Sequence, residues 1–306
     1  MKAEILGFRI EGGLGVVQFA TPDQDTLQYI SSEKAINGRL MEVREVSEAG
    51  RVNTLVVLNH SDSFVFLLDG DILVGAKQNR VVNTSMLLAP ASRTEIPVSC
   101  VEQGRWRSVS PHLREAPYVA PCTLRAEKTA RITMNLEQRR GYLADQERVW
   151  DGVALFQLAA GVESKTENLG DVFEEKRNEL DAALSAHEPL PGANVLVVTA
   201  GCRMVSLDVF NRRDIYAEYF PRILRGMALE ALCLGAGEPP PAAEGESRAL
   251  DLLARVEALP RKTFPGAGVG TEGRFGAQGL AGSELVYEGR LVHLMAVEGG
   301  SGKEAS

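Results

Sequence analysis

Cysteine is scarce in this chain of 306 residues, which contains only four. Cys100, Cys122, Cys202 and Cys233 are widely spaced and form no CxxC pair, so a zinc site of the usual spacing is not supported and a reduced setting fits best. No stretch approaches the roughly 20 apolar residues needed to span a bilayer. The amino-terminal stretch MKAEILGFRIEGGLG also lacks the apolar run of a secretory signal. We therefore expect a cytoplasmic protein with no membrane partner.

An excess of positive charge is also missing. Lys and Arg number 33 against 41 Asp and Glu, which gives a net charge of −8. Because nucleic acids and anionic lipids attract clustered Lys and Arg, we expect no nucleic-acid partner. Hydrophobic residues make up 44% and charged residues 24% of the chain, values typical of a globular protein with a packed core.

The first 130 residues predict a β-rich part. Short apolar or alternating runs are separated by Gly, Asp and Asn, and Asp69–Gly70–Asp71 resembles a hairpin turn. Many short strands of this kind favour a β-sandwich or an open barrel. The expected strands cover residues 15–20, 52–59, 64–68, 71–74, 85–89 and 94–101.

Residues 131–298 predict helices together with two hairpins, which makes the fold class α+β. Helical periodicity covers 136–160, 171–186, 214–233 and 248–259, with Pro221 expected to kink the third helix. Strand-like runs around Gly201, and around a tight turn at Glu288–Gly289, predict hairpins over 194–210 and 284–297. Composition indicates a mobile linker over 235–247 and a disordered tail over 299–306. We expect the two parts to pack as one compact unit.

The most unusual stretch, GAKQNRVVNTSMLLAPASRTEIPVSCVEQGRW, puts polar residues between runs typical of buried strands. If residues 77–83 form a strand, Lys77, Asn79 and Asn83 share one face, and Gln78 and Arg80 share the other. Amides and cations together suit a carboxylate, phosphate or sugar ligand. The alternative is a solvated edge strand, where Lys and Arg discourage pairing with another chain.

A thiol and a carboxylate follow in the same stretch. Cys100 and Glu102, two residues apart on a strand, project to one side, where the thiol could act as nucleophile and Glu102 as acid or base. The thiol is otherwise a small buried residue. Arg105 can orient a ligand together with Glu102, and Trp106 can stack on a ring or fill the core. The distant His293 could complete a Cys–His pair or bind ligand, although a half-buried, hydrogen-bonded histidine is the simpler interpretation.

Two weaker signals remain. GAGVGTEGRFG satisfies G-x-G-x-x-G, but a dinucleotide fingerprint needs a strand before it and a helix after it, and neither is predicted here. A glycine-rich loop over a ligand, with Glu272 and Arg274 as its polar members, stays open. Asp208 stands near the end of a predicted strand, where it can hold a ligand or cap a turn.

These segments resemble a known family, named for its association with ADP-ribosylglycohydrolases and with rhodanese/phosphatase-superfamily proteins. The resemblance rests on LLDGDILVGAKQNRVVNTSMLLAP with IPVSCVEQGRW, on VSLDVF with YFPRILRGMALEAL, and on SELVYEGRLVHLMAV, and it covers residues 1 to about 298. It implies a role near ADP-ribose or NAD-derived metabolites. The ligand-facing positions that it implies are Lys77, Gln78, Asn79, Arg80, Asn83, Cys100, Glu102, Arg105 and Trp106.

Three functions are compatible with these residues. The first is binding, and hydrolysis or transfer, of a nucleotide-like or sugar-phosphate ligand, with phosphates on Lys77 and Arg80 and with Glu102 as general base. In this case Asn79 and Asn83 take hydroxyl groups. The second is a non-catalytic domain for metabolite sensing or protein interaction. The third is a structural role, in which the polar cluster is a buried hydrogen-bond network. The sequence identifies no metal, no cofactor and no oligomeric state.

Overall fold

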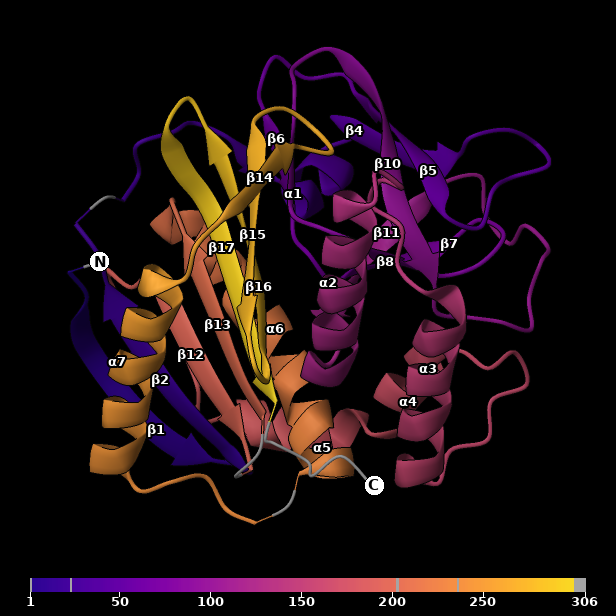
Figure 1. Cartoon of the computed structure of the whole chain (residues 1–306). Coiled ribbons are helices and arrows are strands. Elements are labelled where there is room, and N and C mark those ends of the chain that lie inside the picture. Colours follow the sequence, from indigo (N-terminus) through magenta and orange to yellow (C-terminus); the bar gives the residue numbers. More distant parts are fainter. Residues whose placement is uncertain (1, 23, 202–203, 236, 300–306) are drawn as a thin grey trace.

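A computed structural model describes residues 2–22, 24–201, 204–235 and 237–299, arranged as two β-sheet bodies with helices between and around them (Figure 1). Cys202 and residues 300–306 of the expected tail lie outside these ranges. The larger body is an eight-stranded sheet whose neighbours are all antiparallel. Its strands, in spatial order, are β1 (Glu4–Glu11), β2 (Leu14–Ala20), β12 (Val195–Ala200), β13 (Met204–Phe210), β17 (Arg290–Gly299), β16 (Leu280–Tyr287), β15 (Thr271–Ala277) and β14 (Lys262–Pro265).

The second body is a closed six-stranded barrel. Its strands, in order around the barrel, are β10 (Ser92–Cys100), β5 (Thr54–Asn59), β4 (Met41–Glu45), β11 (Leu113–Val119), β7 (Asp71–Gly75) and β8 (Arg80–Val82). At one end, which we call the barrel mouth, β4, β7 and β10 end while β5, β8 and β11 begin. A small sheet accompanies the barrel and contains β3 (Ile30–Ser31), β6 (Val65–Leu67) and β9 (Met86–Leu88).

Helices cover both faces of the large sheet. On one face α6 contacts β12 and the barrel strand β11, and α2 contacts β16 and β17, so both helices lie between the sheet and the barrel; α7 covers β1 and β2 on the other face (Figure 1). The helices are α1 (Ser32–Asn37), α2 (Cys122–Glu137), α3 (Gln146–Ala160), α4 (Leu169–Glu175), α5 (Arg177–Leu184), α6 (Arg213–Leu234) and α7 (Ala242–Ala258). Of the helices described, none combines the length and apolar character that a bilayer span requires.

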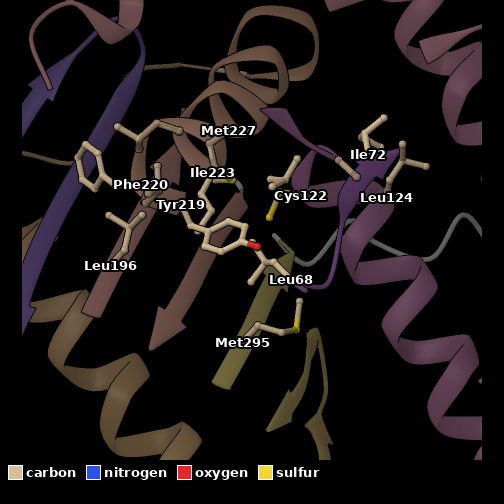
Figure 2. Packing of buried hydrophobic residues seen from close by; sticks show 14 of the residues in the cluster. Leu68, Ile72, Cys122, Leu124, Leu196, Tyr219, Phe220, Ile223, Met227 and Met295 are labelled. Carbon is tan, nitrogen blue, oxygen red and sulfur yellow. The ribbon is translucent and has the colours of Figure 1, made fainter. Parts of the chain in front are cut away.

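The largest hydrophobic core fills the space between the large sheet and the barrel. Figure 2 shows Tyr219 and Ile223 of α6 packed near Leu68, Cys122 and Met295. A second cluster fills the barrel, and a third lies under α7. Because α6 presents buried side chains to both bodies, its apolar content joins the sheet and the barrel into one core.

The α+β class, the β-rich first half and both predicted hairpins are confirmed, and the barrel is closed rather than open. The helix expected over 136–160 is wrong at its start, because α2 ends at Glu137 and α3 begins only at Gln146, where Asp145 caps it. The expected helix over 171–186 is two helices that meet at Lys176. Residues 242–247 of the expected linker belong to α7.

Two turn predictions also need correction. Asp69–Gly70–Asp71 is a turn, but it connects β6 of the small sheet with β7 of the barrel, which do not pair with each other. The glycine motif leads into the strand β15 rather than a helix, so it is not a dinucleotide fingerprint. Glu272 and Arg274 lie within that strand, fully buried, instead of on a loop over a ligand.

Candidate functional site

The barrel mouth collects charged side chains from three strands. Arg80 begins β8 and pairs in register with Cys100, the last residue of β10, while Glu45 is the last residue of β4. Arg80 and Cys100 stand two residues from Val82 and Val98, which belong to the barrel core. Since residues two apart on a strand project to the same face, both side chains point to the barrel interior at its mouth.

The Arg80 side chain is fully buried, and no described residue accepts a hydrogen bond from its Nε, Nη1 or Nη2. The nearest carboxylate is that of Glu45, whose Oε1 lies 3.9 Å from Nη2 and already accepts the backbone N–H of Lys77 at 3.2 Å. Burial lowers the pKa of Arg80. Burying a charge is unfavourable by several kcal/mol, and an ion pair at 3.9 Å without a hydrogen bond offsets only part of this. The barrel mouth therefore has three strong donors and lacks a matching acceptor among the described residues.

An aromatic ring and a second cation complete the mouth. The Trp106 ring centroid lies 5.6 Å from Cζ of Arg80 and 5.4 Å from Nζ of Lys77, within the range of cation–π attraction. Trp106 is 45% exposed, so the ring contacts both the cations and the solvent. Gly50, in the loop between β4 and β5, comes so close that a Cβ there would lie 3.0 Å from Cδ of Lys77.

The neighbouring turn between β7 and β8 is held by a carboxylate. Glu102 is buried, and its Oε2 accepts hydrogen bonds from Arg105 Nη2 at 2.6 Å and from the backbone N–H of Asn79 at 3.0 Å. Its Oε1 accepts from Arg105 Nε at 2.7 Å and from Thr166 at 3.0 Å. Gln78 donates to the Glu102 carbonyl. Both carboxylate oxygens thus fix the turn that leads into Arg80.

The strand expected over 77–83 is wrong at its start, because residues 76–79 form this turn and only Arg80–Val82 belong to β8. Ala76 has a positive φ of 42°, which marks the turn. The turn changes which residues share a face. Asn79 therefore lies with Glu102, while Lys77 lies with Trp106 and Arg80.

Cys100 is fully buried beside Arg80. Its thiol donates to the Glu102 carbonyl at 3.3 Å, and its backbone is held by Gln146. Burial raises the pKa of Cys100, although the Glu102 carbonyl contact and the Arg80 charge act in the opposite direction. Because the thiolate is the nucleophilic form, this environment keeps the sulfur in its less reactive state.

The structure places Asn83 and His293 away from the mouth. Asn83 accepts from Ser99 at 2.8 Å and donates to the Tyr142 carbonyl at 2.9 Å. His293, on β17, is fully rather than half buried, and its Nδ1 lies 3.0 Å from Oγ of Ser85. His293 therefore does not form a pair with Cys100.

His293 belongs instead to a group that we call the central charge cluster, formed by Asp69, Arg125, Lys128, Asp208 and His293. Arg125 donates to both carboxylate oxygens of Asp208, at 2.6 and 3.1 Å, and Lys128 donates to both oxygens of Asp69, at 3.0 and 2.9 Å. Nε2 of His293 lies 3.4 Å from Asp208. All five side chains are buried. Burial alone would raise the pKa of Asp208, but Arg125 holds it well below its usual value.

Asp208 thus neither caps a turn nor holds a ligand at an open strand end. It lies within β13 and pairs with Arg125. Sequence reasoning missed Arg125 and Lys128. Their spacing of three residues puts both on one face of α2, which is a readable signal once a helix is expected there. It also missed Glu45, for which no local signal exists.

The described part of the chain contains no group of three His, Cys, Asp or Glu side chains that could hold a metal ion. No curated protein and no solved structure matches this sequence. A family model, described as the ARG and Rhodanese-Phosphatase-superfamily-associated Protein domain, matches residues 3–297. This match covers nearly the whole chain, and the protein belongs to the ARG and Rhodanese-Phosphatase-superfamily-associated Protein domain family.

Proposed function

We propose that this protein binds a small phosphate-bearing ligand at the barrel mouth. The observation that carries the proposal is the buried Arg80 guanidinium, to which no described residue offers a hydrogen-bond acceptor. Its Nε, Nη1 and Nη2 donate to no described residue, and guanidinium matches the geometry of phosphate well. Lys77 adds a second positive charge at the Trp106 ring.

The ring narrows the class of ligand. Trp106 is half exposed and can stack on a flat group, such as a nucleobase, while Arg80 holds the phosphate. The family name links these chains to ARG and to rhodanese-phosphatase-superfamily proteins. Nucleotide-like or sugar-phosphate ligands, with ADP-ribose and NAD among them, are therefore the first candidates.

Two observations favour binding without turnover, as in a metabolite sensor. Both oxygens of Glu102 already accept hydrogen bonds from Arg105 and from other described donors, which leaves this carboxylate poorly suited to act as a general base. The raised pKa of Cys100 disfavours a thiolate nucleophile. In this proposal Glu102 and Cys100 position Arg80 instead of reacting.

The test is thermal unfolding with phosphate, pyrophosphate, AMP, ADP-ribose and NAD. A ligand of the folded state raises the melting temperature by mass action, so at least one of these compounds should do so in the wild type. Arg80→Met should abolish the shift. Arg93→Met is the matched control, because Arg93 is an exposed arginine on β10 of the same barrel, and it should keep the shift.

Two results would contradict the proposal. If no compound of the panel changes the melting temperature of the wild type, the mouth does not bind this class of ligand. If Arg80→Met responds as the wild type does, the ligand binds elsewhere.

A further inference from the structure

The barrel mouth also contains an acceptor without a partner. Oε2 of Glu45 is buried, and among the described residues nothing donates a hydrogen bond to it. Oε1 of the same carboxylate is occupied by the Lys77 backbone N–H. Gly50 closes over this oxygen, since a Cβ on Gly50 would lie 3.1 Å from Oε2. One oxygen of the carboxylate is thus held in place, while the other is buried without a donor among the described residues.

A carboxylate at this position disfavours a simple anion. An inorganic phosphate on Arg80 would lie close to the negative charge of Glu45, which is 3.9 Å from the guanidinium, and like charges at this range repel. A ligand that carries a hydroxyl group near its phosphate offsets this repulsion, because the hydroxyl donates a charge-assisted hydrogen bond to the carboxylate. A site built to bond a hydroxyl rejects analogues that lack it.

We infer that Glu45 makes the barrel mouth selective for phosphorylated sugars, with the phosphate on Arg80 and a sugar hydroxyl on Oε2 of Glu45. This inference rests on the proposed function of the mouth and adds the residue that chooses between ligands. Arg80 supplies affinity for any phosphate. Glu45 lowers the affinity for bare phosphate and raises the affinity for a polyol phosphate.

Calorimetric titration with inorganic phosphate and with ribose 5-phosphate tests the inference on wild type and on Glu45→Gln. Glutamine keeps an oxygen for the Lys77 N–H and puts an NH₂ group, which cannot accept a hydrogen bond, in place of Oε2. We expect Glu45→Gln to bind inorganic phosphate as well as or better than the wild type and to bind ribose 5-phosphate about tenfold more weakly. Glu95→Gln, an exposed carboxylate on β10, should change neither affinity.

The outcomes separate this inference from the proposed function. Suppose that Arg80→Met loses both ligands and that Glu45→Gln changes both affinities by the same factor. Glu45 is then only a counter-charge of Arg80. Selectivity by Glu45 is refuted, but phosphate binding at the mouth stands. If Arg80→Met binds both ligands as the wild type does, the proposed function fails and this inference fails with it.

Discussion

The barrel mouth and the central charge cluster both bury an arginine, but only the arginine of the cluster has hydrogen-bond acceptors among the described residues. In the cluster, Arg125 donates two hydrogen bonds to Asp208. At the mouth, Arg80 is as deeply buried, yet its closest carboxylate, on Glu45, is beyond hydrogen-bond distance. A charge with hydrogen-bonded partners stabilises the fold, whereas a buried guanidinium without acceptors among the described residues is unfavourable until a ligand supplies them. From this difference we propose that the central charge cluster stabilises the fold and that the barrel mouth binds a ligand.

The positions of the two regions in the fold agree with this division. The cluster joins α2 to β13, β17 and the turn after β6, so it links segments that are far apart in the chain. The mouth lies at the end of the barrel, where loops replace strands and Trp106 reaches the solvent. Mouths of barrels are common places for ligand sites, because side chains there need not fill the interior.

The strongest test of the comparison replaces each arginine by methionine. Arg125→Met leaves Asp208 buried without its main partner and should destabilise the protein by about 3–5 kcal/mol. Arg80→Met removes a buried charge that lacks hydrogen-bond acceptors among the described residues, together with its 3.9 Å ion pair to Glu45, so the free energy of unfolding should change little. Urea unfolding of both variants measures the difference. Equal destabilisation by the two substitutions would show that Arg80 is structural, and the comparison would break down.

A smaller effect is expected inside the mouth itself. Glu102→Gln removes the charge that organises Arg105 and the N–H of Asn79, so we expect a loss of about 2–3 kcal/mol in the free energy of unfolding. Because Glu102 holds the turn that positions Arg80, the variant should bind ligand more weakly but should still bind it. Urea unfolding and a ligand titration measure the two effects. A variant that binds ligand normally but loses a measurable turnover would instead identify Glu102 as a catalytic base.

Much of the fold could be predicted from local patterns, and the failures have physical causes. The hairpins over 194–210 and 284–297 were predictable because short apolar runs are separated there by turn residues, such as Gly201 and Glu288–Gly289. The helix α2 was missed because it buries polar residues, Arg125, Lys128 and Thr129 among them. Residues that look solvated in the sequence thus form part of its inner face, beside Cys122, Leu124, Ile132 and Leu136. Periodicity cannot detect a helix whose buried side is charged.

The candidate site was predictable in its residue types but not in its geometry. The sequence drew attention to Arg80 and Trp106, which the structure brings together. It could not reveal the turn before Arg80, because one turn changes the face on which every later side chain lies. Glu45 reaches the mouth only through the pairing of β4 with β5 and the closure of the barrel, which are long-range contacts.

The last effect depends on pH and concerns a third buried arginine, which gives the comparison a second contrast. Arg222 on α6 serves two carboxylates, since it lies 2.8 Å from Asp71 and 2.8 Å from Glu115. Burial raises the pKa of Glu115 to about 8; Arg222 opposes this rise and the neighbouring Asp71 adds to it. Arg80 lacks hydrogen-bond acceptors among the described residues, whereas Arg222 faces two carboxylates with a single positive charge.

The sign of the pH effect follows from the raised pKa. Between pH 4.5, the pKa of Glu115 in the unfolded chain, and about pH 8, the folded protein keeps the Glu115 proton and the unfolded chain does not. The contribution of Glu115 to the free energy of unfolding is therefore full below pH 4.5 and is lost as the pH rises through 8. We expect the free energy of unfolding to fall by about 3 kcal/mol from pH 5 to pH 8 on this account, since it falls by about 1.4 kcal/mol per pH unit wherever only the folded protein holds the proton. Glu115→Gln imitates the protonated form and should remove this decline, while the exposed Glu95→Gln should retain it. Urea unfolding across this range decides the matter, because an unchanged decline in Glu115→Gln would mean that Arg222 keeps both carboxylates ionised and is balanced as fully as Arg125.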